Sequence, residues 1–287
     1  MENSIEIKGL TCRYNNFVLE NLYLTVPCGT VMGLIGENGA GKSTTIKAIL
    51  GLIEPESGSV TVLGEDSTKL SAAAKEQIGV VFDTLPFPAV LTAKQLGKVL
   101  GGIFKTWDST EYYNYLERFC LPADKKLGSF SRGMQMRLSI AAALSHHPKL
   151  LVLDEPTGGL DPVMRAEILD LLMDFIQDES HSILISTHIT SDLEHIADYI
   201  GFIHKGHLVF SEERNALKEK HRILKCTDEE LKRIDPADII GMRKGRFANE
   251  VLTASGDKYP DIAQDIPSID ELMVYYVKDA DEWRDAI

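Results

Sequence analysis

The sequence of 287 residues predicts an α/β protein with a parallel β-sheet, an antiparallel β subdomain, an α-helical insert and a small C-terminal α+β domain. Short apolar runs alternate with helix-prone segments, which is typical of a parallel sheet covered by helices. A mainly helical pattern interrupts this alternation in the middle of the chain, and the composition becomes charged and polar near the C-terminus. We expect a first domain over residues 1–210, with its helical part at about 84–149, and an accessory domain over residues 211–287.

The parallel sheet is predicted from four apolar runs and the segments between them. Short continuous apolar stretches bounded by turns indicate strands that are buried on both faces. After the second run, residues 92–144 show a mainly helical pattern with Pro and Gly punctuation. The expected strands are residues 31–35, 78–82, 150–153 and 182–186, and the expected flanking helices are residues 45–50 and 163–177.

The two ends of the chain predict smaller elements. Residues 5–13 and 21–26 indicate an antiparallel opening, with a turn at residues 27–29, and residues 54–58 break the chain before a strand at 59–63. Ser268, followed by two acidic residues and an apolar run, indicates a capped final helix that ends at Val277. Between them the accessory domain is expected to hold helices at residues 212–220 and 228–233 and strands at 222–226 and 246–253.

A phosphate-binding loop is predicted at residues 36–44. The segment satisfies G-x-x-x-x-G-K-[ST], and a strand enters it while a helix leaves it. An ordinary Gly-rich turn would need neither Lys42, which reaches the β- and γ-phosphates in such loops, nor Ser43, whose hydroxyl binds Mg²⁺. The glycines let several backbone N–H groups face one anion at a helix N-terminus. The residues expected to contact the nucleotide here are Gly36, Asn38, Gly39, Ala40, Gly41, Lys42, Ser43 and Thr44.

Two acids follow the apolar strand at residues 150–153. A carboxylate at the C-terminal edge of a parallel sheet lies where such sheets bind ligands. Asp154 is expected to hold Mg²⁺ or its water, and Glu155 to orient and polarise the water that attacks the γ-phosphorus. Alone, an apolar run that ends in Asp-Glu is more often a plain strand end. Together with the phosphate loop, the two acids predict hydrolysis.

Composition excludes several other classes of function. The formal net charge of −13 argues against general binding to nucleic acid or to a lipid surface. No apolar stretch approaches the 18 residues of a membrane span, and the first residues lack the pattern of a signal peptide. A membrane role would therefore need a partner that spans the bilayer. The four cysteines lack metal-ligand spacing and are expected to be reduced thiols in a cytosolic protein: Cys12, Cys28, Cys120 and Cys226.

Residues 1–210 resemble the ATP-binding subunit of an ATP-binding cassette (ABC) transporter. Beyond the two motifs above, residues 130–134 stand at the signature sequence of the family, and residues 158–161 match the loop that crosses its dimer interface. The resemblance implies that Tyr14 stacks on adenine and that His188 is the switch histidine, which reaches the γ-phosphate. A ring N–H there can stabilise charge in the transition state.

The same resemblance implies partners. A second nucleotide-binding subunit, as a homodimer or with a close paralogue, would sandwich two ATP and two Mg²⁺ with this chain, and a separate polytopic transmembrane permease would hold the pair at the cytoplasmic face of the membrane. No nucleic acid is expected. Taken alone, Ser131 is equally explained as a plain helix N-cap. The residues implied to contact the nucleotide of the second subunit are Ser131, Arg132, Gly133, Met134 and Asp161.

Three positions depart from the family pattern. Asp83 stands where the family has Gln; it can still bind Mg²⁺, but its side chain is one methylene shorter, which puts the coupling to a membrane partner in doubt. Arg132 replaces the first glycine of the signature, and Met134 replaces a polar residue. Because Lys42 and Glu155 are both present, we still expect ATP hydrolysis.

The single cassette and the segment at residues 269–276 resemble bacterial exporters of antimicrobial or amphipathic peptides, including phenol-soluble-modulin exporters. Two alternatives are a soluble ABC-type ATPase of DNA repair or translation and a non-hydrolytic regulatory subunit. The first would carry a coiled-coil insert or two cassettes, and Glu155 and His188 oppose the second. The apolar, Pro-rich residues 83–91 indicate either a docking site for a membrane partner or simple packing beneath the helical insert.

Overall fold

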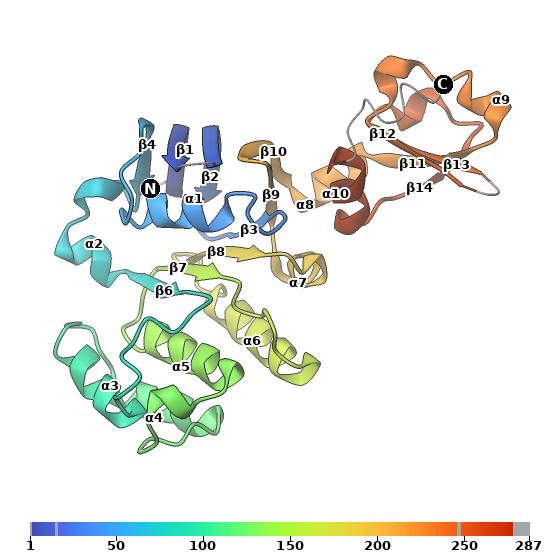
Figure 1. The fold of residues 1–287 in the computed structure, drawn as a ribbon. Coiled ribbons are helices and arrows are strands. Elements are labelled where there is room, and N and C mark those ends of the chain that lie inside the picture. The colour runs from blue at the N-terminus through green and yellow to red at the C-terminus, as the bar shows by residue number, and fades with distance from the viewer. Residues whose placement is uncertain (1, 15–16, 246–247, 278–287) are drawn as a thin grey trace.

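A mixed six-stranded sheet forms the centre of the computed structural model, which describes residues 2–14, 17–245 and 248–277 (Figure 1). The strand order is β10-β9-β3-β8-β7-β6. Neighbouring strands are parallel from β9 to β6, and only β10 is antiparallel to its neighbour. The strands are β3 (Val31–Ile35), β6 (Ile78–Val81), β7 (Leu150–Asp154), β8 (Ser182–Thr187), β9 (Tyr199–His204) and β10 (His207–Glu213).

The hairpin of β9 and β10 was not predicted. Its turn consists of Lys205 and Gly206, which both have positive φ, at 45° and 84°. Two residues of this conformation form the tight turn whose twist matches that of the flanking strands. The hairpin runs past the domain boundary expected at residue 210, because β10 continues to Glu213. The helix expected at residues 212–220 therefore begins only at Arg214, as α8 (Arg214–Lys220).

The predicted antiparallel sheet is present, and it covers one face of the central sheet with α1 (Lys42–Ile49) between them (Figure 1). Met32 and Leu34 of β3 are buried in the same cluster as Ile5 and Ile7 of the antiparallel sheet and Ile46 of α1. The second strand of the antiparallel sheet begins at residue 17, four residues before the predicted start. The sheet consists of β2 (Phe17–Pro27), β1 (Asn3–Tyr14), β4 (Ser57–Val62) and β5 (Glu65–Asp66), in that order.

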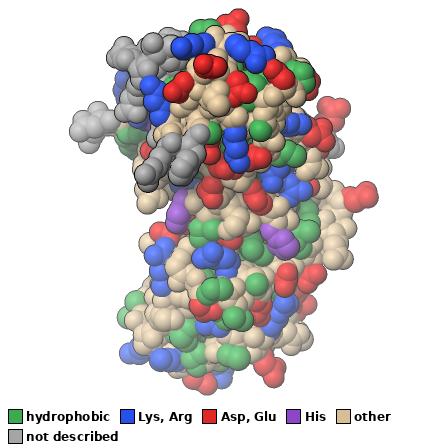
Figure 2. All heavy atoms as spheres, turned by 90° about the vertical axis from the view of Figure 1, so that its right-hand side faces the viewer, with side chains coloured by type: hydrophobic (Ala, Val, Ile, Leu, Met, Phe, Trp, Pro, Cys, Tyr) green, Lys and Arg blue, Asp and Glu red, His purple; other side chains and the backbone are tan. Residues whose placement is uncertain are grey.

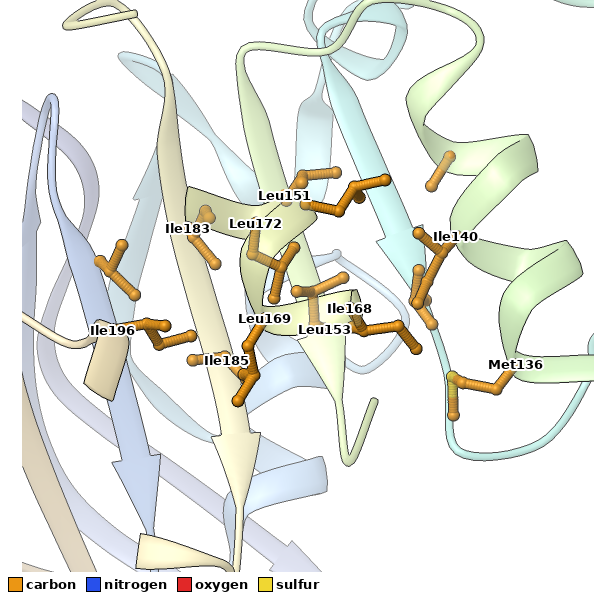
Figure 3. Packing of buried hydrophobic residues seen from close by; sticks show 14 of the residues in the cluster. Met136, Ile140, Leu151, Leu153, Ile168, Leu169, Leu172, Ile183, Ile185 and Ile196 are labelled. Carbon is orange, nitrogen blue, oxygen red and sulfur yellow. The ribbon is translucent and has the colours of Figure 1, made fainter. Parts of the chain in front are cut away.

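Helices cover the opposite face. Along β7, Leu151 and Leu153 point into the cluster formed with these helices, whereas the alternate residues join the cluster under the antiparallel sheet. Leu172 packs on this face beside Leu151 (Figure 3). Because β7 is buried on both faces, its sequence is a continuous apolar run rather than an alternating one. The helices are α5 (Arg132–Leu144), α6 (Pro162–Phe175) and α7 (Thr190–Ile196).

The helical insert lies between β6 and β7. Each of its helices begins at a side-chain cap: Thr92 and Gln95 form a capping box, and Asp108 and Ser131 each accept a hydrogen bond from the backbone three residues ahead. Tyr112 is fully buried and donates a hydrogen bond to the carbonyl oxygen of Ala93, 2.9 Å away. The insert contains α3 (Ala93–Gly101), α4 (Ser109–Arg118) and α5, and the small α2 (Ala72–Glu76) precedes β6.

The accessory domain has its own four-stranded sheet and apolar core. Ser268 and Glu271 cap its last helix reciprocally, as predicted. The predicted strand at residues 246–253 appears from Asn249 onward, while residues 246 and 247 lie outside the described part of the chain. Its elements are β11 (Arg222–Cys226), α9 (Asp228–Leu231), β12 (Gly241–Lys244), β13 (Asn249–Thr253), β14 (Ala263–Asp265) and α10 (Ile269–Val277).

The accessory domain packs against α7 of the first domain (Figure 1). The carboxylate of Glu194, on α7, accepts a hydrogen bond from the backbone N–H of Ile269 at 3.0 Å and lies 3.3 Å from the ammonium of Lys218. On the accessory-domain side, side chains of both charge signs are interspersed over the surface (Figure 2). Within the described residues, no helix combines the length and hydropathy that crossing a membrane requires.

His221 is fully buried where α8 meets α10. Its Nδ1 donates to the carbonyl oxygen of Leu217 at 2.8 Å, and its Nε2 shares a hydrogen bond with the hydroxyl of Tyr276 at 2.9 Å. Burial is the main cause that lowers the pKa of His221, and the nearby Lys220 lowers it further, against opposing effects of Leu217 and Glu212. Burial likewise lowers the pKa of His146 beneath the helical insert.

These histidines predict a pH-dependent stability. The unfolded chain protonates them as pH falls through about 6.5, while the folded protein resists protonation until lower pH. The free energy of unfolding should therefore fall as pH drops below about 6.5. His221→Gln should flatten this dependence in urea denaturation measured between about pH 5 and 8, and His195→Gln, at an exposed position, should not. An unchanged slope in His221→Gln would contradict the assignment.

Candidate active site

The loop between β3 and α1 curls as the sequence predicts. Gly36 approaches the neighbouring strand so closely that an added Cβ would lie 2.3 Å from the carbonyl oxygen of Ile203. Gly41 has φ of 124° and immediately precedes α1. Both positions exclude a side chain, because one would clash with backbone and the other would be strained. The loop N–H groups and the N-terminus of α1 thus converge on one anion-binding concavity.

A cavity of about 530 Å³ opens above this loop. Most of the residues predicted to bind the nucleotide or metal, and the predicted catalytic Glu155, line it: Tyr14, Asn38, Gly39, Gly41, Lys42, Ser43, Thr44, Asp83, Asp154 and Glu155. Three further lining residues were not predicted: Phe17, Glu37 and Lys47. Phe17 pairs with Tyr14 across the end of the β1–β2 hairpin, so two aromatic residues border the cavity there. The available signal was the presence of two aromatic residues three positions apart in the sequence.

Not every predicted residue lines the cavity. Gly36 and Ala40 lie behind it as buried supports of the loop, and Gly36 contributes its carbonyl oxygen to Lys42. His188 lies outside the lining but contacts it through Glu155. The residues of the signature segment and Asp161 form a separate group, which is described below.

Lys42 is the buried cation of the site, with 5% of its surface exposed. Its Nζ donates to the carbonyl oxygens of Gly36 at 2.7 Å and Glu37 at 3.3 Å, and it lies 3.3 Å from Oε1 of Glu155. A buried ammonium requires such partners, because desolvation is costly for a charge that is not paired and hydrogen-bonded. The residue expected to bind phosphate thus joins the phosphate loop to the end of β7.

Glu155 links this lysine to His188. Its Oε2 lies 2.7 Å from Nδ1 of the histidine ring, and its backbone has φ of 52°, an uncommon conformation for a residue with a side chain. Its Oε1 is buried and forms no hydrogen bond with any described residue, although the ammonium of Lys42 is near. The carboxylate is therefore held by two groups, the His188 ring and the Lys42 ammonium, and keeps one oxygen able to accept a proton.

Oxygen ligands of the kind that Mg²⁺ prefers gather beside the loop. The Ser43 hydroxyl and the carboxylates of Asp83 and Asp154 line one small cavity together. Asp154 is buried, and its Oδ1 accepts a hydrogen bond from the hydroxyl of Ser186 on the neighbouring β8. Hard oxygen donors of this number and charge fit Mg²⁺ coordination.

The signature segment forms a second group on the first turn of α5. Ser131 accepts a hydrogen bond from the backbone N–H of Met134 at 3.3 Å, and Asp161 caps α6 in the same manner. Both residues thus serve as the plain N-caps that local reasoning allows. Arg132 hydrogen-bonds the Oδ1 of Asp83 through its Nη2, so the two charged departures from the family pattern contact each other.

Comparisons with known proteins agree with this geometry. The ABC transporter family model matches residues 19–158, and a model described as an AAA domain, putative AbiEii toxin, matches residues 126–191. The bacitracin transport ATP-binding protein BcrA of Enterococcus faecalis is 37% identical over 89% of this chain and 80% of its own length. The lantibiotic transport ATP-binding protein SrtF of Streptococcus pyogenes is 37% identical over 73% of this chain and 90% of its own.

This chain belongs to the ATP-binding proteins of ABC transporters. A solved ATP-binding subunit of an ABC transporter shares the fold with a TM-score of 0.68 and 28% identity, over 75% of this chain and 92% of the other. A cassette solved as a dimer with ADP and Pi shares the fold at a TM-score of 0.65 and 23% identity, over 73% of this chain and 98% of its own. The chain is therefore an ATP-binding cassette, and the ATPase activity of the family is expected of it.

Replacement of Lys42 tests the phosphate loop. Lys42→Ala should weaken the binding of a fluorescent ATP analogue by about 10- to 100-fold, because a charged hydrogen-bond donor to the phosphates is lost. Lys47→Ala is a matched control, since this exposed lysine lies on the same helix and lines the same cavity. Circular dichroism would verify that each variant is folded. Equal affinities of Lys42→Ala and the wild type would remove the lysine from this role.

Proposed function

We propose that this chain is the ATP-hydrolysing subunit of an exporter for antimicrobial or amphipathic peptides. Two copies, or one copy and a close paralogue, enclose two MgATP, and a separate transmembrane permease anchors them at the cytoplasmic face of the membrane. The observation that carries the proposal is the linked group of Lys42, Glu155 and His188 at the edge of the central sheet. A binding subunit without hydrolysis has no need of the last two residues.

The chemistry follows from this group. Lys42 is already positioned by loop carbonyls, and phosphate oxygens would replace some of these partners when nucleotide binds. Glu155 is the general base, because its buried Oε1 has no hydrogen-bond partner among the described residues and can accept a proton from water. His188 orients this carboxylate through its ring and can stabilise the negative charge that develops on the γ-phosphate.

Ser43, Asp83 and Asp154 would hold Mg²⁺, which neutralises charge on the phosphates when it is bound. The support is their shared small cavity and their oxygen donors. The aromatic ring of Tyr14, together with that of Phe17, lines the larger cavity, where it would stack on adenine.

The dimer is proposed from the location of the signature group. Ser131 and Arg132 lie on the exposed first turn of α5 and do not line the cavity of their own chain. Such a helix N-terminus is suited to a phosphate that another subunit holds. A relative of the same fold has been solved as a dimer in a post-hydrolysis state. Closure around ATP then takes its energy from tighter binding of ATP to the closed state.

The cargo is proposed from named relatives. Two BcrA proteins carry the description bacitracin transport, and SrtF carries the description lantibiotic transport. Both substances are antimicrobial peptides, which agrees with the class expected from the sequence. The permease is proposed because the relatives are named as ATP-binding proteins of transport systems.

Glu155→Gln tests the hydrolytic step. The variant should keep ATP binding and lose turnover by about 100- to 10,000-fold, the contribution of a general base. It should also accumulate as a dimer in MgATP, measured by size-exclusion chromatography with light scattering. Glu37→Gln is the control, because this exposed acid lines the same cavity. Near-normal phosphate release by Glu155→Gln would exclude the base assignment.

The same variant identifies the partner. Tagged Glu155→Gln protein, recovered with MgATP from detergent-solubilised membranes of its host, should bring down a polytopic membrane protein in stoichiometric amount. Vesicles that contain both proteins would then be assayed for peptide transport. Recovery of only soluble or ribosomal partners under every detergent condition would contradict the exporter and favour a soluble ATPase.

A further inference from the structure

Arg132 and Asp83 bring together two loops that are 49 residues apart in sequence. Asp83 follows β6, and Arg132 is the first residue of α5 in the helical insert. Nη2 of the arginine donates to Oδ1 of the aspartate. We propose that this pair is a latch that holds the carboxylate of Asp83 while the site is empty and releases it when a divalent cation binds. We call it the Arg132–Asp83 latch.

The location of Arg132 favours an acidic partner. At the first position of α5, the partial positive charge of the helix terminus disfavours a cation. The guanidinium also lies against the turn after Glu155, since a Cβ added at Gly158 or Gly159 would approach its nitrogens to 3.7 and 3.6 Å. Asp83 offsets the unfavourable helix charge. The arginine thereby lies between the loop after β6 and the turn after β7.

Asp83 has two competing interactions, one with the proposed Mg²⁺ site and one with Arg132. Its carboxylate lines the same small cavity as Ser43 and Asp154, which are the proposed Mg²⁺ ligands, and it is also the partner of Arg132. A divalent cation beside this carboxylate would repel the guanidinium, because like charges a few ångströms apart raise each other's energy. Occupation of the metal site therefore competes with the latch.

The latch is weak enough to open. The side chains of Arg132 and Asp83 are 57% and 44% exposed, and exposed ion pairs are screened by water and salt. Mg²⁺ can therefore displace the arginine at modest cost. Opening would free the first turn of α5, with Ser131, from the end of β6. Arg132 is thus a positioning residue for Asp83 that couples metal loading to the placement of the signature helix.

This inference rests on the proposed function for the Mg²⁺ site, and a cycle of variants tests it. The probe is a fluorescent ATP analogue at fixed concentration, titrated with MgCl₂ at protein concentrations too low for dimers. Arg132→Ala should lower the Mg²⁺ concentration for half-maximal binding by about two- to fivefold, the factor that corresponds to an exposed ion pair. Lys125→Ala, which removes an exposed charge from the same insert, should not change it.

The double variant separates the latch from other roles of Arg132. Asp83→Ala should raise the half-maximal Mg²⁺ concentration, and adding Arg132→Ala to it should produce no further change. If Arg132→Ala shifts the half-maximal Mg²⁺ concentration equally with and without Asp83→Ala, Arg132 acts on the nucleotide directly. If Arg132→Ala alone causes no shift, Arg132 does not compete with Mg²⁺ for Asp83. Either result overturns the latch while the proposed function stands. Wild-type protein that binds no analogue at any Mg²⁺ concentration overturns both proposals.

Discussion

The buried charge of Lys42 is the constraint on which the rest of the site depends. Lys42 has 5% of its surface exposed, so its ammonium needs oxygen partners, and the chain supplies them from the phosphate loop and from Glu155. This requirement holds the loop after β3 against the end of β7, although β8 lies between these two strands in the sheet. The glycines of the loop and the left-handed backbone of Glu155 accommodate the close approach.

From Glu155 the contacts continue outward to the accessory domain. His188 contacts the carboxylate, and the chain then enters α7, whose Glu194 binds the start of α10 and the side chain of Lys218. The accessory domain is thus attached to the element that leaves the active site. Helices α8 and α10 both contact α7, through Lys218 and through the backbone of Ile269.

Arg132 and Asp83, the two charged residues that depart from the family pattern, form an ion pair with each other. Arg132 alone would place a cation at a helix N-terminus, and Asp83 alone would add a carboxylate to a site that already holds Asp154 and Glu155. Their contact neutralises both charges while the site lacks a metal. Substitution of one residue without the other would leave a charge uncompensated, so they are best studied as a pair.

Local features of the chain were predictable from the sequence. The phosphate loop, the buried β7 with its two acids, and the caps at Ser131 and Ser268 follow from the order of neighbouring residues. The β9–β10 hairpin carried a two-residue turn signal at Lys205 and Gly206 that was missed. Only the tertiary structure decided the pairing of Lys42 with Glu155 and of Arg132 with Asp83, because contacts between residues distant in sequence depend on how strands and helices pack, which no local pattern records.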